Sequence, residues 1–278
     1  MLESPRQAES DQRADEVASE PPPLAVITGA ARGIGAATAL ALARDGWSLL
    51  LIDACAAQPG ITYAMPGARE LGAVAERGLA AGASSAQTLV ADVACGDFCG
   101  RVRDALAGRT PAAAVAAAGV IAGGPAWATS DQAWATLIDV NLHGTRRLAE
   151  ATVPAMVAAG RGRFIAIASA AALRALAQLA AYSAAKAAVA GFIRALAADL
   201  AGTGVTANAI CPGSTRGPML SASAALYDLP DERQFAEQHL LRRVLEPAEV
   251  ASAVAWLCGP GGSAVTGAVL PIDGGLTA

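Results

Sequence analysis

The chain has 278 residues, 54% of them hydrophobic, and carries a formal net charge of −4 at pH 7. A chain of this length and composition can bury a large core, which we expect to form one α/β domain rather than two small ones. Because the charge balance is acidic and no long basic run occurs, neither nucleic acid nor an anionic membrane is an expected partner, and a small-molecule substrate is.

The N-terminal segment, residues 1–23, holds six acids, two arginines and a proline triplet. It lacks the apolar core of a secretory signal and is typical of a disordered tail. Apolar runs elsewhere are too short and too often interrupted by glycine to span a bilayer. The five cysteines are Cys55, Cys95, Cys99, Cys211 and Cys258. They are odd in number, lack CxxC spacing and lie far in the sequence from both histidines. We therefore expect reduced thiols in a cytoplasmic protein, and no metal site.

From Leu24 onward, short apolar runs alternate with alanine-rich helical stretches. This alternation implies crossover connections and a mostly parallel sheet flanked by helices, which is the doubly wound α/β architecture. We therefore expect one domain over residues 24–278. The seven predicted strands fall at residues 24–28, 47–53, 87–92, 113–119, 162–169, 204–210 and 268–273.

Two segments between the predicted strands have unusual length. Residues 54–67 are longer than an ordinary turn after a strand and contain two Pro-Gly pairs, so they are predicted to form an inserted, irregular loop. The longest helical stretch is predicted to begin near Thr129, where Gln132 follows at capping-box spacing. Asn141 falls in the middle of that helix.

The first strand runs directly into TGAARGIGAAT, which places Gly29, Gly33 and Gly35 at the turn into a helix. Glycines let the backbone approach a pyrophosphate, whose charge a helix N-terminus favours, although an ordinary tight turn has the same composition. The second strand ends in Asp53, where a carboxylate can bind an adenosine ribose and repel a 2′-phosphate, so NAD is favoured over NADP. Arg32 complicates this choice, because its guanidinium could pair with a phosphate, or else face solvent or brace the loop.

The third and fourth strands add residues at the same edge of the predicted sheet. Asp92 and Val93 follow the third strand, and Ala118 and Gly119 end the fourth. Asp92 is placed to contact an adenine. A role as the N-cap of the next helix would explain an aspartate at this position equally well. Open parallel sheets bind ligands beyond the carboxyl ends of their strands, so the shared location of these residues predicts a dinucleotide site.

Lys186 is the only lysine of the chain and lies four residues after Tyr182, so on a helix both side chains point the same way. Ser169 closes the fifth strand and can lie across the same crevice. Interconversion of an alcohol and a carbonyl needs a proton moved on or off the oxygen, and a nearby ammonium would lower the tyrosine pKa from its usual value of about 10. Packing, capping and helix bending explain Tyr182, Ser169 and Asn141 separately, whereas their conjunction predicts a catalytic site.

These motifs together resemble the short-chain dehydrogenase/reductase family, from about Leu24 to the C-terminus: TGAARGIG, Asn141, Ser169, YSAAK and NAICPGS. The resemblance implies a Rossmann-type single domain, homotetrameric or dimeric assembly, and a catalytic tetrad of Asn141, Ser169, Tyr182 and Lys186. The expected cofactor contacts are Gly29, Arg32, Gly33, Ile34, Gly35, Asp53, Asp92, Val93, Ala118, Gly119, Tyr182, Lys186, Pro212, Gly213 and Thr215.

Within that family, GAARGIGAAT, the loop after Asp53, VAAAGVIAGG, LAAYSAAK and AVAWLCGP are similar to the mycofactocin-coupled subfamily. In that subfamily the inserted loop is thought to help bury NAD so that it does not exchange, and electrons leave through the redox peptide mycofactocin. The resemblance implies that residues 54–67 form such a lid. A tolerated surface insertion is the alternative.

Two positions depart from the family pattern. The family commonly has NNAG after the fourth strand, whereas residues 116–119 read AAAG, so a side-chain amide that braces the sheet is missing. The family also tends to carry a threonine where this chain has Gly217, and Thr215 is the candidate replacement.

Substrate specificity is expected to reside in residues 212–243. Met219, Leu220, Leu226 and Tyr227 are predicted to wall an apolar pocket there, although ordinary helix packing explains them as well.

The sequence therefore predicts an NAD-dependent oxidoreductase that interconverts an alcohol and its carbonyl. In this hypothesis Tyr182 is the acid/base, Ser169 holds the substrate oxygen, Lys186 lowers the tyrosine pKa, and Asn141 positions a water for proton relay. Two alternatives stay open: a family member with ordinary, exchangeable NAD(P), and a non-catalytic NAD-binding sensor or scaffold.

Overall fold

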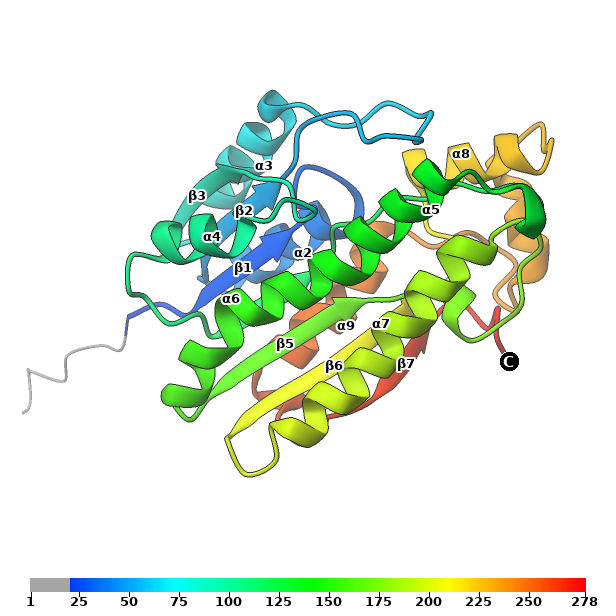
Figure 1. The fold of residues 1–278 in the computed structure, drawn as a ribbon. Coiled ribbons are helices and arrows are strands. Elements are labelled where there is room, and N and C mark those ends of the chain that lie inside the picture. The colour runs from blue at the N-terminus through cyan, green and yellow to red at the C-terminus, as the bar shows by residue number, and fades with distance from the viewer. Residues whose placement is uncertain (1–20) are drawn as a thin grey trace, which may run out of the picture.

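The structure is a computed structural model that describes residues 21–278, so the tail predicted at residues 1–23 lies almost entirely outside the described residues. One seven-stranded sheet has the order β3-β2-β1-β4-β5-β6-β7 (Figure 1). Every pair of neighbouring strands is parallel, where the sequence predicted a mostly parallel sheet. The strands are β1 (Leu24–Thr28), β2 (Ser48–Asp53), β3 (Ser85–Val90), β4 (Ala113–Ala116), β5 (Gly162–Ile167), β6 (Val205–Pro212) and β7 (Val269–Ile272).

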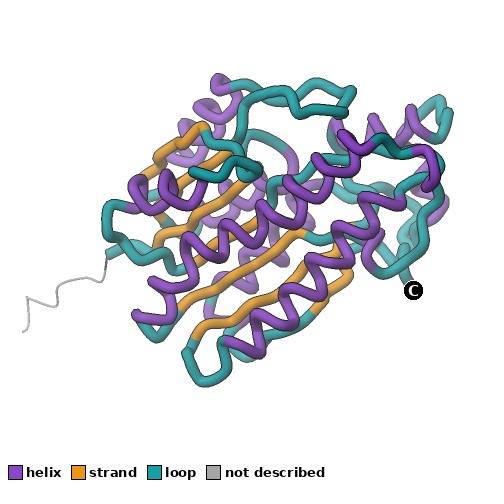
Figure 2. The backbone as a smooth tube through the Cα atoms, viewed as in Figure 1, coloured by secondary structure: helices purple, strands orange, loops and turns teal. Residues whose placement is uncertain are grey.

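Helices cover both faces of the sheet (Figure 2). The core on one face joins the strands to α4, α6 and α7, and the core on the other joins them to α2, α3 and α9. None of the helices within residues 21–278 is both long and apolar enough to cross a membrane. The α-helices are α2 (Gly33–Arg44), α3 (Ala68–Ala80), α4 (Phe98–Leu106), α5 (Asp131–Ile138), α6 (Gly144–Ala158), α7 (Ala180–Asp199), α8 (Pro218–Leu226) and α9 (Pro247–Cys258).

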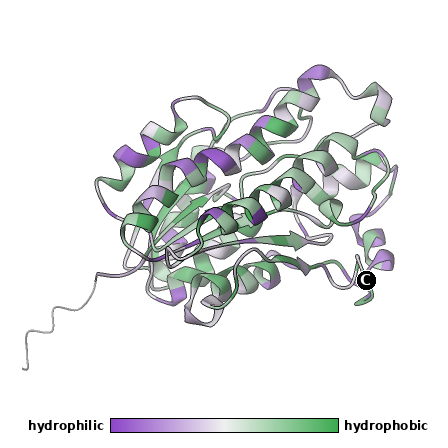
Figure 3. Cartoon of the chain, turned by 60° about the horizontal axis from the view of Figure 1, so that its bottom comes forward, coloured by the Kyte–Doolittle hydropathy of each residue, from purple (hydrophilic) through white to green (hydrophobic). Residues whose placement is uncertain are grey.

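The strands are apolar on both sides because both faces of the sheet are covered. In β1, Leu24 and Val26 belong to one core, while Ala25 and Ile27 belong to the other. This period of two is the alternation of side chains in a strand. Figure 3 shows hydrophobic residues along the strands, whereas the helices carry both hydrophobic and hydrophilic residues.

The long helical stretch runs from Asp131 to Ala158 and changes its hydrogen-bond pattern in the middle. The Ser130 hydroxyl accepts the Ala133 N–H at 3.2 Å, so Ser130 is the N-cap and not Thr129, which the sequence had suggested. A five-residue π-helix, η2 (Asp139–His143), separates α5 from α6. Asn141 lies in this π-helix, a rare feature that often marks functional sites.

The carboxyl edge of the sheet carries the segments that the sequence associates with function. Residues 54–67 contain neither helix nor strand. They lie beyond the strand ends, on the same side of the molecule as α8 (Figure 1). Short 3₁₀-helices complete this region and the chain: η1 (Ala126–Ala128), η3 (Ala170–Ala172), η4 (Glu232–Gln238) and η5 (Pro260–Gly262).

Candidate active site

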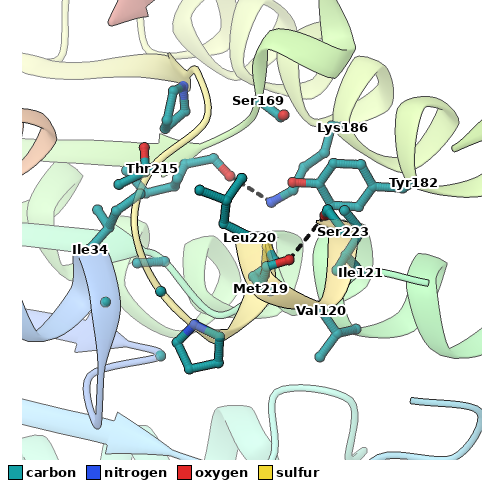
Figure 4. A pocket seen from close by; sticks show the side chains of 18 of the residues that line it. Ile34, Val120, Ile121, Ser169, Tyr182, Lys186, Thr215, Met219, Leu220 and Ser223 are labelled. Atoms are coloured by element: carbon teal, nitrogen blue, oxygen red, sulfur yellow. Dashed lines mark hydrogen bonds between the residues drawn. The ribbon is translucent and has the colours of Figure 1, made fainter. Parts of the chain in front are cut away.

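A cavity of about 720 Å³ opens at the carboxyl edge of the sheet. Its walls come from the loops that follow β1 to β6 and from α7 and α8 (Figure 4). Every residue that the sequence assigned to the cofactor borders this cavity, and so does Ser169. Asn141 does not border it. The structure therefore brings the predicted cofactor and catalytic residues to one site, apart from the Asn141 side chain.

The glycine turn is shaped by close backbone packing. Gly29 adopts φ +65°, and a Cβ atom there would lie 2.6 Å from the Ala118 nitrogen. A Cβ atom at Gly35 would collide with the Gly29 carbonyl oxygen. Gly33, at φ +58°, has open space in front of it. Close packing therefore requires glycine at positions 29 and 35, and the opening at Gly33 leaves room for a ligand at the α2 N-terminus.

The buried Asp53 carboxylate ties two segments together. One oxygen accepts the Ala31 N–H at 3.1 Å, and the other accepts the Cys55 N–H at 3.1 Å. Asp53 thus fixes the glycine turn to the start of the 54–67 loop. Because a carboxylate has about four acceptor positions, the group can still bind a further donor.

Arg32 turns toward the 54–67 loop. Its guanidinium donates to the Ala64 carbonyl at 2.7 Å and to the Met65 sulfur at 3.4 Å. The guanidinium carbon also lies 5.6 Å from the centre of the Tyr63 ring, within cation–π range. In this structure Arg32 therefore braces the 54–67 loop.

The Asp92 carboxylate accepts hydrogen bonds from the neighbouring backbone and from the 54–67 loop. Its Oδ1 accepts the Ala94 N–H at 2.8 Å, and its Oδ2 accepts the Gln58 side-chain N–H at 2.8 Å. Val93, next in the chain, is buried against Gly144. Sequence reasoning missed Gln58; the only signal was its position inside the insertion.

A threonine hydroxyl braces the strand end where the sequence lacks the usual amide. The Thr28 hydroxyl accepts the N–H groups of Ala117 and Ala118, each at 3.2 Å. It lies on the neighbouring strand β1 and is itself buried. Thr28 thus supplies a brace between the ends of β1 and β4, which the sequence analysis did not foresee.

The Asn141 amide is fully engaged with the backbone. Its Nδ2 donates to the carbonyls of Val120 at 3.0 Å and Leu137 at 2.9 Å, and its Oδ1 accepts the Val120 N–H at 3.3 Å. A Cβ atom at Gly119 would lie 2.9 Å from that same oxygen. Asn141 therefore fixes the loop after β4 against the π-helix, a position from which its side chain does not reach the cavity.

Ser169, Tyr182 and Lys186 surround one point of the cavity (Figure 4). Ser169 follows β5, and its hydroxyl oxygen accepts the Ala171 N–H at 3.1 Å. Tyr182 and Lys186 project from α7, with the lysine nitrogen 5.8 Å from the tyrosine ring centre. That nitrogen donates to the Ile167 carbonyl at 2.8 Å. The arrangement places two hydroxyl groups and an ammonium at the carboxyl end of β5.

Burial dominates the acidity of this cluster. Desolvation raises the pKa of Tyr182 to about 12, more than hydrogen bonding to Ser169 lowers it. Desolvation also lowers the pKa of Lys186 to about 8. The sequence predicted a lowered tyrosine pKa, whereas the net shift is upward, because burial of the Tyr182 hydroxyl outweighs the hydrogen bond from Ser169.

The loop after β6 closes the cavity opposite the glycine turn. Pro212, Gly213 and Thr215 line it, and the Thr215 hydroxyl donates to the Gly213 carbonyl at 3.0 Å. Gly217 has φ +146°, which disfavours the threonine that the family pattern places there. The buried His239 accepts the Ser214 N–H at 3.2 Å, a support for this loop that the sequence did not reveal.

The substrate side of the cavity was only partly anticipated. Met219, Leu220 and Tyr227 line it, as the sequence predicted. Leu226 does not line it, because its side chain packs against Gly123. Within residues 21–278, no group of three His, Cys, Asp or Glu side chains could hold a metal ion, and all five cysteines are free thiols.

Comparisons with known proteins agree with this geometry. A family model described as enoyl-(acyl carrier protein) reductase matches residues 29–277. An uncharacterized NAD-dependent oxidoreductase from Mycobacterium tuberculosis is 34% identical over 91% of this chain and 94% of its own. The short-chain reductase protein NovJ from Streptomyces niveus is 36% identical over 94% of this chain and 96% of its own.

The fold also matches a solved structure along nearly its whole length. Carveol dehydrogenase from Mycobacterium avium, crystallised with NAD, superposes with a TM-score of 0.86 at 27% identity. The match covers 91% of this chain and 97% of the carveol dehydrogenase chain.

Proposed function

The chain belongs to the short-chain dehydrogenase/reductase family, and we propose that it is an NAD-dependent oxidoreductase that interconverts an alcohol and its carbonyl. The observation that carries the proposal is the single cavity that holds both the glycine turn at α2 and the Ser169, Tyr182 and Lys186 side chains. A relative named as NAD-dependent and a structural neighbour crystallised with NAD support the choice of cofactor.

The residues at the α2 N-terminus fit a pyrophosphate. Within the part of the chain that the structure describes, the N–H groups of Gly33, Ile34 and Gly35 have no hydrogen-bond acceptor. The space in front of Gly33 is open. Free N–H groups at a helix N-terminus attract an anion, so this end of the cavity suits the phosphates of a dinucleotide.

Charge at the second strand supports NAD over NADP. Asp53 presents a buried carboxylate at the cavity wall, which favours ribose hydroxyls and opposes a 2′-phosphate. Arg32, the nearest candidate partner for such a phosphate, is engaged by the 54–67 loop. The cofactor contacts that we propose are those predicted from the sequence.

The proposed mechanism assigns proton handling to Tyr182. A bound NAD would supply the hydride acceptor for oxidation of the alcohol carbon, and NADH the hydride donor for reduction of the carbonyl carbon. Tyr182 donates its proton to the substrate oxygen in reduction, and its phenolate accepts the hydroxyl proton in oxidation. Because its pKa is about 12, Tyr182 is a neutral phenol near neutral pH, the form that reduction uses.

Ser169 and Lys186 assist that proton transfer. The Ser169 oxygen accepts the Ala171 N–H, which leaves its O–H as a donor. That O–H bonds Tyr182 in this structure and would turn to a substrate oxygen bound beside both hydroxyl groups. Lys186, with a pKa of about 8, is mostly charged near neutrality and stabilises negative charge on Tyr182. One of its three N–H groups is bonded to Ile167, and the others are available for a ribose hydroxyl.

We assign Asn141 a positioning role in place of direct contact. Its amide fixes Val120 and abuts Gly119, so it shapes the loop that the nicotinamide end would meet. The water relay predicted from the sequence stays a prediction.

We further propose that residues 54–67 retain the cofactor and that electrons leave through mycofactocin. Three contacts support a closed loop: Gln58 to Asp92, Tyr63 to the Ile121 N–H, and Arg32 to the loop backbone. These contacts join the loop to the segments after β3, β4 and β1. A loop fixed at three points opposes release of a dinucleotide from the cavity beneath it.

The first experiment is to purify the protein without added nucleotide, pass it through gel filtration, denature it and measure NAD(H) by mass spectrometry. Near-stoichiometric NAD(H) supports the retained cofactor and directs assays toward an artificial electron acceptor. Absence of NAD(H) supports an ordinary, exchangeable cofactor and contradicts the mycofactocin proposal.

A panel of primary and secondary alcohols then tests the enzymatic proposal, with free NAD and with a redox dye as alternative acceptors. Tyr182→Phe serves as the inactive control. Turnover by the native protein alone supports the mechanism. Failure with every alcohol and both acceptors would favour the non-catalytic sensor. A cytoplasmic location and a homotetrameric assembly stay predictions, the second of which sedimentation can test.

A further inference from the structure

The substrate side of the cavity offers a ligand mainly apolar surface. Its walls include Leu176, Leu179, Met219, Leu220, Leu229 and Phe235. The few hydroxyl groups there are engaged: Ser223 donates to the Met219 carbonyl at 3.0 Å, and Tyr227 donates to the Ala177 carbonyl at 2.6 Å. Figure 4 shows Met219, Leu220 and Ser223 projecting from α8. Apart from Arg174, Arg216 and Gln238, the side chains that the body of the substrate meets on this side are therefore mainly hydrocarbon.

Arg174 is an exception on this side of the cavity. It borders the cavity five residues after Ser169, in the segment that leads to α7. Its side chain makes no salt bridge with a carboxylate of residues 21–278. Arg216, which also borders the cavity, has its charge balanced by Glu246 at 2.8 Å and Glu232 at 3.6 Å. Arg174, an exposed residue, thus brings a positive charge without an acidic partner to the solvent-facing edge of an apolar pocket.

The backbone of the C-terminal segment orients this guanidinium. One Arg174 N–H donates to the Leu276 carbonyl at 2.8 Å. The Asp273 carboxylate holds that turn by accepting the N–H groups of Gly275 and Thr277, each at 2.9 Å. A guanidinium has five N–H donors in a planar fork, so most of them are still free after the bond to Leu276.

We propose that the substrate is an apolar alcohol or ketone that carries a carboxylate at its far end, and that Arg174 binds this carboxylate. The inference rests on the proposed oxidoreductase function. The hydroxyl or carbonyl carbon lies beside Ser169 and Tyr182. The hydrocarbon body packs against the apolar side chains of α8, and the carboxylate reaches the Arg174 guanidinium at the edge of the cavity. The carboxylate is unchanged in the reaction, which converts only CH–OH and NAD to C=O, NADH and a proton.

A series of hydroxy acids of graded chain length tests the proposal. The probes are secondary hydroxy acids of increasing chain length, with the hydroxyl on the penultimate carbon, and their methyl esters. We expect one range of lengths in which kcat/KM is about tenfold higher for the acid than for its ester, as a charge-assisted hydrogen bond provides. Equal values for acid and ester at every length would overturn the proposal.

Matched arginine variants attribute the preference to Arg174. In Arg174→Gln the ratio of acid to ester should fall to about one. Arg77→Gln removes the same charge from the exposed surface of α3, away from the cavity, and should keep the native ratio. If the preference survives in Arg174→Gln, or disappears equally in both variants, Arg174 is not the binding group.

A binding measurement separates this proposal from the proposed function. Calorimetric titration of the hydroxy acids into Tyr182→Phe with NAD present needs no turnover. If an acid binds Tyr182→Phe and its affinity falls about tenfold in the double variant that also carries Arg174→Gln, the inference is supported even when the native protein shows no turnover. Absence of binding for every acid, with turnover of neutral alcohols, would reject the inference and leave the oxidoreductase intact.

Discussion

The contact between Tyr63 and Ile121 allows the retention of the cofactor to be tested without altering the cavity. The Tyr63 hydroxyl accepts the Ile121 N–H at 3.1 Å, and Tyr63 itself does not line the cavity. Tyr63→Phe keeps the ring against Arg32 and removes only the oxygen. The substitution therefore weakens one fastening of the 54–67 loop.

The expected effect follows from the hydrogen bond that is lost. A backbone N–H without its acceptor costs about 1–3 kcal/mol when buried, and the lower limit applies because this contact is only partly buried. If opening of the loop limits release, a cost of about 1 kcal/mol accelerates loss of NAD about fivefold.

The assay is the exchange of bound NAD for isotopically labelled NAD, followed by mass spectrometry over time. Tyr227→Phe is the matched control, because it removes a phenol oxygen bonded to the Ala177 carbonyl on the substrate side. It should leave NAD exchange unchanged and alter the substrate KM. Equal exchange rates for Tyr63→Phe and the native protein, with both folded, would refute the idea that this loop retains the cofactor.

Three further predictions follow from the site. Tyr182→Phe should lower kcat about a thousandfold in a spectrophotometric assay while NAD stays bound, and a loss below about tenfold would contradict the acid/base role. The reductive kcat/KM should be level below about pH 7 and fall as pH rises through about 8, because Lys186 loses its charge there; a profile that is level to about pH 9 would contradict this. Asn141→Ala should reduce the free energy of unfolding in urea by about 3 kcal/mol, because it leaves the buried backbone groups of Val120 unpaired, and a loss below about 1 kcal/mol would contradict the bracing role.

The fold could be read from the sequence because the central strands are apolar on both faces. Six predicted strands contain or closely match the observed ones. The third shows the limit of the method: residues 87–92 were predicted, and β3 occupies Ser85–Val90. This strand lies at the edge of the sheet and is largely exposed, so its hydrophobic pattern marks its ends poorly.

The residues that line the cavity were predictable where a single motif places them, and unpredictable where segments distant in the sequence meet. The spacing of Tyr182 and Lys186 on a helix was enough to place both at the cavity. The bond between Gln58 and Asp92 joins residues 34 apart, and no local pattern indicates it. The direction of the Tyr182 pKa shift was wrong because the sequence shows a neighbouring charge but not the burial of both groups.

The two sides of the cavity are closed by interactions of different kinds. On the cofactor side, the contacts of Gln58 and Tyr63 are partly buried hydrogen bonds. On the substrate side, Arg216 forms ion pairs with Glu232 and Glu246, and the Arg216 and Glu246 side chains are about half exposed. Exposed ion pairs contribute little and are screened by salt, whereas partly buried interactions are screened less. The α8 side of the cavity should therefore open while the 54–67 loop stays closed over the cofactor. An enzyme that retains NADH needs such an opening if an external electron acceptor is to reach it.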